Sequence, residues 1–284
     1  MLKLIITADD YGMSPAVNNA IEAGIEAGLI TSTNVMTNMD YYKDAINLKK
    51  YNSISVGIHF TLTCGKPVSE REKITTLVSP NGIFYNYREF RRRYRLGLIS
   101  NNDIRTELIA QYKRFKELLG NSDYWNTHQN VHVDFRVFKL FVDIACELGI
   151  NKMRSHQRIY VKESNKDSRQ PFIRRVLEPF KVRLINEWQK SAHKKGIASP
   201  NGLIVCLNKS DVIRPDHLFT NIEWKNKLIG EYVIHPATKI DSPFFGRIVD
   251  QRIREYEIFT DLTTLKYIKE AGLVLKNYNE CILE

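Results

Sequence analysis

The chain has 284 residues, of which 43% are hydrophobic and 26% are charged, a balance typical of a globular protein with a sizeable core. No run of about 18 apolar residues occurs, so we expect no transmembrane helix and no membrane partner. The formal net charge is +10, but no nucleic-acid-binding motif accompanies it, so we expect no nucleic acid partner.

The start of the chain and its cysteines both indicate a cytoplasmic protein. The apolar run Leu4–Ile6 is too short for a secretory signal. The four cysteines are scattered and form no CxxC pair, which argues against a cysteine-based zinc site and fits a reducing compartment. Cys146 follows an apolar run, so we expect its thiol to be buried.

The first elements alternate between strand and helix. The stretch Lys3–Thr7, apolar in its middle and bounded by polar residues, predicts a short buried strand. Ser14 and Pro15 then form a typical helix start, because a serine caps the free N–H groups and proline fits the first helical position. Gly28 fits the end of that helix. The β-branched stretch 30–36 predicts a second strand.

The segment 40–49 reads as a helix, and 53–62 reads as a strand in which aliphatic residues alternate with smaller or polar ones. His59 therefore projects from the face opposite the aliphatic set, near the end of the strand. Residues 64–100 look rich in loops and contain five arginines between Arg88 and Arg95, interleaved with Phe90 and Tyr94. We favour a solvated helix face with aromatic anchors for this cluster, and attraction of an anionic substrate is the alternative.

The rest of the chain continues the alternation. Helical spacing of apolar residues covers 104–119 and 137–148, and each of these helices ends at a glycine. A further helical stretch covers 171–195, with an expected interruption at Pro179. The last expected helix covers 260–271. The expected strands are 124–128, 152–155, 203–207, 231–234 and 273–275.

This order predicts an α/β fold built from parallel βα units, either closed into a barrel or wound as an open sheet. We expect one domain over residues 1–284. In α/β barrels the catalytic residues gather at the C-terminal ends of the strands. Five polar sites follow five expected strands here, so they can meet at one mouth: Asp9-Asp10, His59, His128, Arg154 and His235.

The adjacent carboxylates Asp9 and Asp10 repel each other, and a divalent cation would offset that repulsion. Because adjacent side chains point in different directions, one can bind the metal while the other faces a water molecule. A helix-cap role is the alternative, but Ser14 already provides a cap.

The histidines complete the candidate metal site. His59 alone is weak evidence, because a lone strand histidine is more often structural. His128 and His132 have the spacing of one helical turn, and in a strand or loop one of them would bind metal and the other substrate. One carboxylate with two imidazoles is a familiar three-ligand set that leaves positions open for water and a substrate oxygen.

Several stretches together resemble the YdjC/ChbG carbohydrate deacetylase family. Ala8–Gly12 is similar to its ADDFG signature, and 127–132 is similar to its histidine-rich SHxHVH stretch. The other similar stretches, in order, are 31–33, 57–63, 65–69 and 235–237.

The resemblance implies a distorted (β/α) barrel of the glycoside hydrolase/deacetylase type. It implies a divalent metal ion, Mg²⁺ or Zn²⁺, held by Asp10, His59 and His128. It also implies an acetylated oligosaccharide as the partner, from which a metal-dependent hydrolase removes acetyl groups of N-acetylated sugars such as chitin-derived oligosaccharides.

The same resemblance assigns the catalytic roles. Asp9 is the expected general base, His235 is the expected general acid, and Arg154 is expected to orient or tune Asp9. In this mechanism water attacks the amide next to the metal, and the metal stabilises the oxyanion.

The expected substrate contacts are His132, Tyr11 and Lys66. Tyr11 replaces the phenylalanine of the family signature, and it is expected to stack on a sugar face. Gln129 and Asn130 replace histidines that are common in this stretch, which bears on substrate preference.

Alternatives stay open at this point. Phe60 and Trp125 could also stack on sugars, but we favour core packing for both. The enzyme could be a hydrolase or lyase acting on another sugar, and the arginine cluster would suit a phosphorylated one. A metal- or sugar-binding protein without turnover is the third interpretation, and a homodimer is left open.

Overall fold

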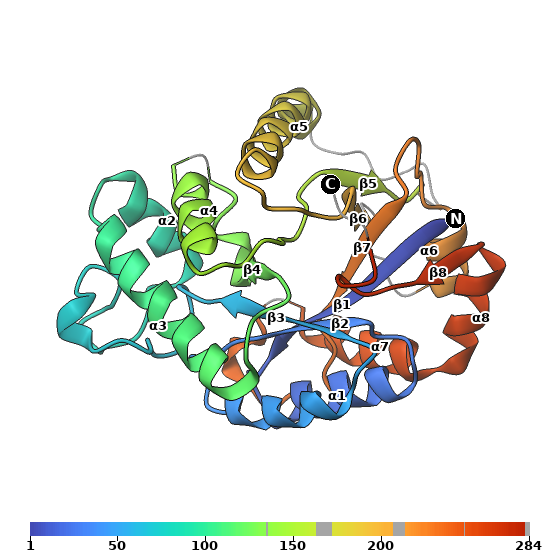
Figure 1. Cartoon of the computed structure of the whole chain (residues 1–284), viewed down its shortest axis with the longest axis horizontal. Coiled ribbons are helices and arrows are strands. Elements are labelled where there is room, and N and C mark those ends of the chain that lie inside the picture. The colour runs from blue at the N-terminus through green and yellow to red at the C-terminus, as the bar shows by residue number, and fades with distance from the viewer. Residues whose placement is uncertain (135, 163–171, 207–213, 247, 282–284) are drawn as a thin grey trace.

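A computed structural model describes residues 1–134, 136–162, 172–206, 214–246 and 248–281 (Figure 1). None of the described helices is long and apolar enough to cross a membrane. The strands are parallel and form one sheet, so the alternation of strand and helix expected from the sequence is confirmed.

The first strand lies at the centre of this sheet. β1 (Leu2–Tyr11) pairs on one side with β7 (Ile229–Ile234). On its other side, β8 (Leu273–Leu275) pairs with the N-terminal half of β1, and β2 (Ser32–Val35) pairs with the C-terminal half. The first strand therefore has neighbours along both edges and is buried over most of its length.

The sheet continues outward in both directions from β1. β3 (Ser55–Phe60) and β4 (Trp125–Thr127) follow β2, while β6 (Gly202–Val205) and β5 (Arg158–Tyr160) follow β7. Single bridges from Trp125 to Met153 and from Lys152 to Ala198 link the two outer parts. The sheet thus curls into the expected distorted barrel, and the segment 152–155 contributes isolated bridges instead of a regular strand.

Helices surround the curled sheet, with α1 and α7 along one flank and α2, α3 and α4 along another (Figure 1). The α-helices are α1 (Pro15–Glu26), α2 (Tyr87–Arg95), α3 (Asn101–Leu119), α4 (Phe138–Glu147), α5 (Phe172–His193), α6 (Pro215–Thr220), α7 (Val249–Thr260) and α8 (Leu262–Glu270). The short 3₁₀ helices are η1 (Tyr42–Lys50), η2 (Arg71–Lys73), η3 (His128–Asn130) and η5 (Pro243–Phe245).

The start of α1 follows the local chemistry expected from the sequence. The Ser14 side chain accepts a hydrogen bond from the Val17 N–H at 3.3 Å, and Pro15 occupies the first helical position. Gly28 directly follows the end of the helix and has a φ of +72°. A residue with a side chain would adopt this backbone conformation only with strain. This helix carries the chain from the end of β1 back to the start of β2.

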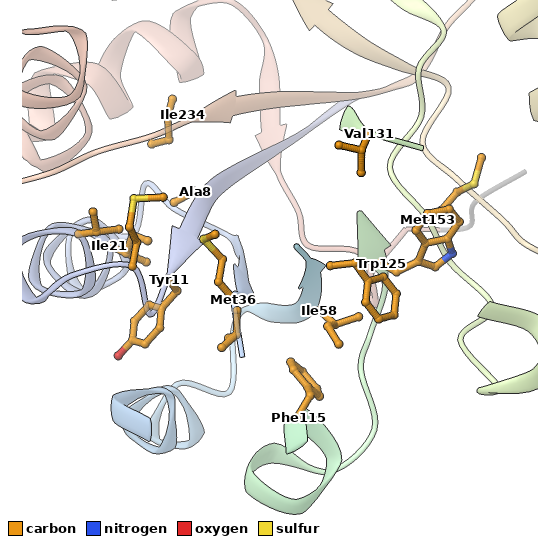
Figure 2. Close-up of a cluster of buried hydrophobic side chains, with 14 of the residues drawn as sticks. Ala8, Tyr11, Ile21, Met36, Ile58, Phe115, Trp125, Val131, Met153 and Ile234 are labelled. Atoms are coloured by element: carbon orange, nitrogen blue, oxygen red, sulfur yellow. The ribbon is translucent and has the colours of Figure 1, made fainter. Parts of the chain in front are cut away.

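The core lies between the sheet and the helices that cover it. Figure 2 shows Ile58 of β3 facing Phe115 of α3, while Trp125 of the neighbouring β4 lies beside Met153. Phe60 and Trp125 are 1% and 0% exposed, so the interpretation of both as core residues is confirmed. Burial of large side chains like these is the dominant favourable contribution to folding.

Several sequence expectations were wrong in detail. The loop-rich reading of 64–100 missed α2, and the segment 40–49 is a 3₁₀ helix instead of an α-helix. Helix α5 continues through position 179 without the expected break. Cys146 is exposed, because it lies on the solvent side of α4.

The helices before the last strand were also predicted incompletely. The sequence reading contained neither α6 nor α7, and the expected helix 260–271 corresponds to α8. The strand expected at 203–207 is β6, and position 207 lies outside the described residues, as does position 171.

Candidate active site

Three of the expected site residues meet at one end of the barrel. Asp10 lies near the end of β1, His59 near the end of β3, and His128 directly after β4. Each offers one ligand atom, and these atoms lie within 4.8 Å of one another. The Oδ1 atom of Asp10 is 3.3 Å from Nε2 of His59 and 3.0 Å from Nδ1 of His128.

This group fits a divalent metal ion. A cation with ligands at about 2.1 Å requires neighbouring ligand atoms about 3.0–3.4 Å apart, from octahedral to tetrahedral geometry. The two distances to Asp10 Oδ1 agree with that requirement.

The backbone of Asp10 explains how two adjacent carboxylates reach the same cavity. In a regular strand the side chains of Asp9 and Asp10 would point to opposite faces of the sheet. Here the pairing of β1 with β2 shifts register between Ala8 and Tyr11, and Asp10 has a φ of +75°. This local irregularity turns both carboxylates toward the mouth of the barrel, where both line one cavity.

Asp9 is held by a buried arginine. Arg154 binds both of its carboxylate oxygens, at 2.6 and 2.8 Å, and the Asn34 amide donates a third hydrogen bond at 2.6 Å. Burial acts to raise the pKa of Asp9, but the Arg154 guanidinium outweighs it and holds that pKa below its ordinary value. Asp9 is therefore ionised and fixed in orientation.

Arg154 is itself supported from the other side. Its Nε atom lies 3.1 Å from Glu231 on β7, and the other oxygen of Glu231 accepts a hydrogen bond from the Tyr278 hydroxyl at 2.8 Å. The Arg154 side chain is 3% exposed, so this chain of contacts lies inside the barrel. The expected link between Arg154 and Asp9 is thus present as a direct ion pair.

His235 lies at the edge of the same cavity, directly after β7. Its Nε2 atom is 3.8 Å from Oδ2 of Asp9, and its side chain is 30% exposed. Burial lowers the pKa of His235 to about 4, against the opposite influence of Asp10 and Asp9. Its imidazole is therefore neutral near pH 7 and can accept a proton before it donates one.

Arg252 is a site residue that the sequence did not reveal. It lies on α7, and its Nη2 atom is 2.6 Å from Oδ2 of Asp10, while its guanidinium stacks on the Phe245 ring. Burial acts to raise the pKa of Asp10, but Arg252 and His128 hold it well below its ordinary value. No sequence signal pointed to Arg252, because α7 itself was not predicted.

Asn126 is a second missed residue, although it lies two residues before His128 in the expected strand. One end of its side-chain amide is 2.5 Å from Nδ1 of His59, and the other end faces Asn34 and Arg154. It therefore fixes the His59 ring and connects the metal-ligand group with the Asp9 pair. Residues next to a candidate metal ligand often have such a supporting role.

The cavity at this site has a volume of about 180 Å³. Its walls include Thr127 and the turn at Gln129 and Asn130, while Phe244 and Phe245 contribute an apolar side. The cavity is thus lined by two carboxylates, imidazoles and a guanidinium, with aromatic rings beside them. Such a site can hold a small polar group next to a cation.

The three expected substrate contacts are not part of this cavity. Tyr11 is 0% exposed and belongs to the core shown in Figure 2, and its hydroxyl donates to Glu22 at 2.6 Å. His132 is 1% exposed. Lys66 is exposed but does not line the cavity. The expectation that Tyr11 stacks on a sugar is therefore wrong, because the end of β1 turns it toward the helices.

His132 contacts two neighbouring side chains and does not line the cavity. Its Nδ1 atom is 2.6 Å from Oγ1 of Thr127, and its Nε2 atom is 2.6 Å from Nε2 of His156. Its ring also lies against Trp125 with centroids 5.1 Å apart. Burial lowers its pKa well below the ordinary value, so it is a neutral interior histidine. This placement corrects the expected contact with substrate.

Comparisons with known proteins agree with this architecture. The family model described as YdjC-like protein matches residues 3–270. The carbohydrate deacetylase of Clostridium beijerinckii is 28% identical to the chain, over 98% of the chain and 100% of that protein. The chitooligosaccharide deacetylase of Proteus mirabilis is 26% identical, over 98% of each.

A solved structure shares the fold. It is a protein of Enterococcus faecalis described provisionally as a cellobiose-phosphate cleavage protein, and it superimposes with a TM-score of 0.74 at 22% identity over 98% of each chain. At this level of identity the likeness concerns the fold alone.

Proposed function

This chain belongs to the YdjC-like protein family, and we propose that it is a metal-dependent carbohydrate deacetylase that removes the acetyl group from N-acetylated sugars. The observation that carries this proposal is the joint arrangement of Asp10, His59 and His128 next to the ion-paired Asp9 in one cavity. The names of the full-length relatives support the substrate class.

A divalent cation held by Asp10, His59 and His128 would supply a Lewis acid that activates water and polarises the acetamide carbonyl. Two imidazole ligands favour zinc or a similar transition metal over magnesium, which prefers oxygen ligands. Arg252 binds Oδ2 of Asp10 and leaves Oδ1 turned toward the imidazoles, so the carboxylate is oriented to offer one oxygen.

The proton transfers fall to Asp9 and His235. Asp9 is ionised because Arg154 lowers its pKa, so it can take a proton from the water that attacks the amide carbon. Because that pKa is low, Asp9 does not retain the proton. His235, 3.8 Å from Asp9, accepts it and donates it to the amine nitrogen as the carbon–nitrogen bond breaks, which yields acetate and a free amino sugar.

The test is acetate release from N-acetylglucosamine mono-, di- and trisaccharides by the protein after chelation and after addition of single divalent metals. We expect Asp9→Asn to reduce kcat by at least about 10²-fold, the usual contribution of a general base. The matched control is Asp40→Asn, which changes an exposed aspartate outside the cavity and should leave the rate unchanged.

Unchanged acetate release by Asp9→Asn would remove Asp9 from the role of base. Binding of metal and sugar by the wild type without any acetate release would instead favour a binding protein over an enzyme.

A further inference from the structure

Helix α7 binds both backbone polar groups of His235. Oε2 of Glu255 accepts a hydrogen bond from the His235 N–H at 2.6 Å, and Nη1 of Arg252 donates to the His235 carbonyl oxygen at 3.5 Å. Pro236 has no N–H and restricts the backbone of the residue before it to extended conformations. The N–H of Ala237 donates to the Arg252 carbonyl oxygen at 3.1 Å. The segment 235–237 is therefore docked on one turn of α7.

Glu255 is itself fixed in place. Its other oxygen, Oε1, accepts a hydrogen bond at 2.7 Å from the amide of Gln251, which lies four residues earlier on the same face of the helix. Glu255 is 0% exposed, so no water replaces these donors. A shift of the carboxylate would break both hydrogen bonds, and the acceptor for the His235 N–H therefore has a defined position.

The burial of this carboxylate costs free energy. Burial raises the pKa of Glu255 to about 7, against the opposite influence of the hydrogen bonds from Gln251 and His235 and of the charge of Arg252. A neutral side chain of the same size would avoid that cost. Folding alone therefore does not favour a carboxylate at this position, which directs attention to the side chain that the docked segment carries.

The imidazole of His235 depends on this backbone for its place. His235 directly follows β7 and lines the candidate active site, where its Nε2 atom is 3.8 Å from Oδ2 of Asp9. This distance is longer than a hydrogen bond, and among the described residues no hydrogen bond holds the ring itself. A proton donor that is misplaced by about 1 Å can lose about 10²-fold in rate, so the anchoring of the backbone affects the chemistry.

We propose that Glu255 is a positioning residue for proton donation by His235. Glu255 does not line the cavity, and it acts through the His235 N–H, which it binds so that Nε2 can pass the proton from Asp9 to the leaving amine. The inference rests on the proposed deacetylase function. One face of α7 thus orients the candidate metal ligand Asp10 through Arg252 and the proton donor through Glu255.

The test compares two reactions that differ in their need for a proton donor. The amine of an N-acetylated sugar leaves only when it is protonated, whereas 4-nitrophenolate leaves from 4-nitrophenyl acetate as an anion. In Glu255→Met, which has a similar size but no acceptor, kcat for acetate release from N-acetylglucosamine disaccharide should fall at least about tenfold, with KM within about twofold. The metal-dependent kcat for 4-nitrophenyl acetate should stay within about twofold, because Asp9 and the metal-ligand group are unchanged.

Glu255→Gln is the conservative variant. Its side-chain oxygen can still accept from the His235 N–H, so kcat for the disaccharide should remain within about threefold of the wild type. The matched control is Glu257→Met, because Glu257 lies on the same helix but is exposed and pairs with Arg254, and both reactions should be unchanged. An equal loss of both reactions in Glu255→Met, an undiminished kcat for the disaccharide in that variant, or a tenfold loss in Glu255→Gln would overturn the proposal.

Crystal structures of the variants separate this inference from the proposed function. Each variant is first shown by thermal melting to be folded, and Glu255→Asp, whose carboxylate is one methylene group further from the His235 N–H, replaces Glu255→Met under the same criteria if the latter is unfolded. We expect the His235 ring to be displaced from Asp9 in Glu255→Met and to keep its place in Glu255→Gln. A displaced ring in a protein that releases acetate from no substrate would refute the deacetylase function alone, whereas an unmoved ring in Glu255→Met would refute the positioning role.

Discussion

At the scale of single residues, each of the two adjacent aspartates has its own guanidinium partner. Arg154 binds Asp9 and Arg252 binds Asp10, each with a shortest contact of 2.6 Å. Buried carboxylates are costly unless they are paired, and here the pairing also assigns different environments to two neighbouring residues. The repulsion that the sequence indicated is therefore offset by two arginines as well as by any cation.

The ion pair between Arg154 and Asp9 should contribute strongly to stability. Arg154→Gln should lower the free energy of unfolding by about 3–5 kcal/mol, because it leaves Asp9 and Glu231 as buried carboxylates without their common partner. Denaturant titration measures this change. Arg92→Gln, which breaks an exposed pair, serves as the control and should leave the free energy of unfolding unchanged.

The same variant should change the pH dependence of stability. The folded-state pKa of Asp9 is depressed, so its contribution to stability is present above the unfolded pKa of about 3.9 and is lost as pH falls through the folded pKa. In Arg154→Gln this depression is removed, so unfolding free energy should fall less steeply between about pH 5 and pH 2. An acid limb as steep as that of the wild type would contradict this explanation.

At the scale of elements, β3 shows why the inner face of the barrel requires a small residue. A Cβ atom added to Gly57 would lie 2.7 Å from the ring of Tyr124 and 2.8 Å from its carbonyl oxygen. Gly57 lies on the same strand face as His59, two residues before it. This close approach brings β3 against the start of β4 and so sets the spacing between His59 and His128.

We therefore expect Gly57→Ala to reduce the free energy of unfolding by about 1–3 kcal/mol, the usual cost of overpacking. Gly82→Ala is the comparison, because Gly82 has a φ of +74° but faces open space, so it carries only the backbone strain of about 1–2 kcal/mol. To separate the effect on the site from the effect on stability, acetate release is measured below the melting temperature. Full activity with unchanged stability in Gly57→Ala would show that the contact is not tight.

The elements that the sequence predicted well are those with a strong local signal. β1 has a continuous apolar run, α1 has the Ser14-Pro15 start, and α3 has regular helical spacing with Gly120 at its end. Helix α2 was missed because five arginines and no apolar stripe obscure its single buried anchor, Phe90. Its cap at Asn86, which accepts a hydrogen bond from Glu89, was the local signal available.

At the scale of the whole molecule, the C-terminal segment crosses the N-terminal ends of several strands. Thr31 donates to the carbonyl of Lys276 at 2.8 Å, and the Asn277 side chain donates to the carbonyl of Ser53 at 2.9 Å. Tyr278 enters the barrel from this side and stacks on Tyr124 with ring centroids 3.9 Å apart. The segment 276–278 thus closes the barrel opposite the candidate active site and supports Glu231.

The candidate site could be predicted only in part, because some of its residues have a local sequence signal and others are brought in only by tertiary contacts. Asp9, Asp10, His59 and His128 lie at or directly after the C-terminal ends of strands and have recognisable motifs, so their meeting at one mouth follows from a parallel sheet. Tertiary partners have no such local signal, and Arg252 and the partners of Tyr11 therefore came only from the structure.

The central claim is that Asp10, His59 and His128 share one divalent cation, and metal analysis of the purified protein tests it most directly. After chelation and titration with zinc, we expect close to one ion bound per chain in the wild type and in Asp9→Asn. Asp10→Ala should lose most of this binding, because a ligand is removed while the fold, checked by thermal melting, persists. An equal amount of tightly bound metal in Asp10→Ala and in the wild type would contradict the account.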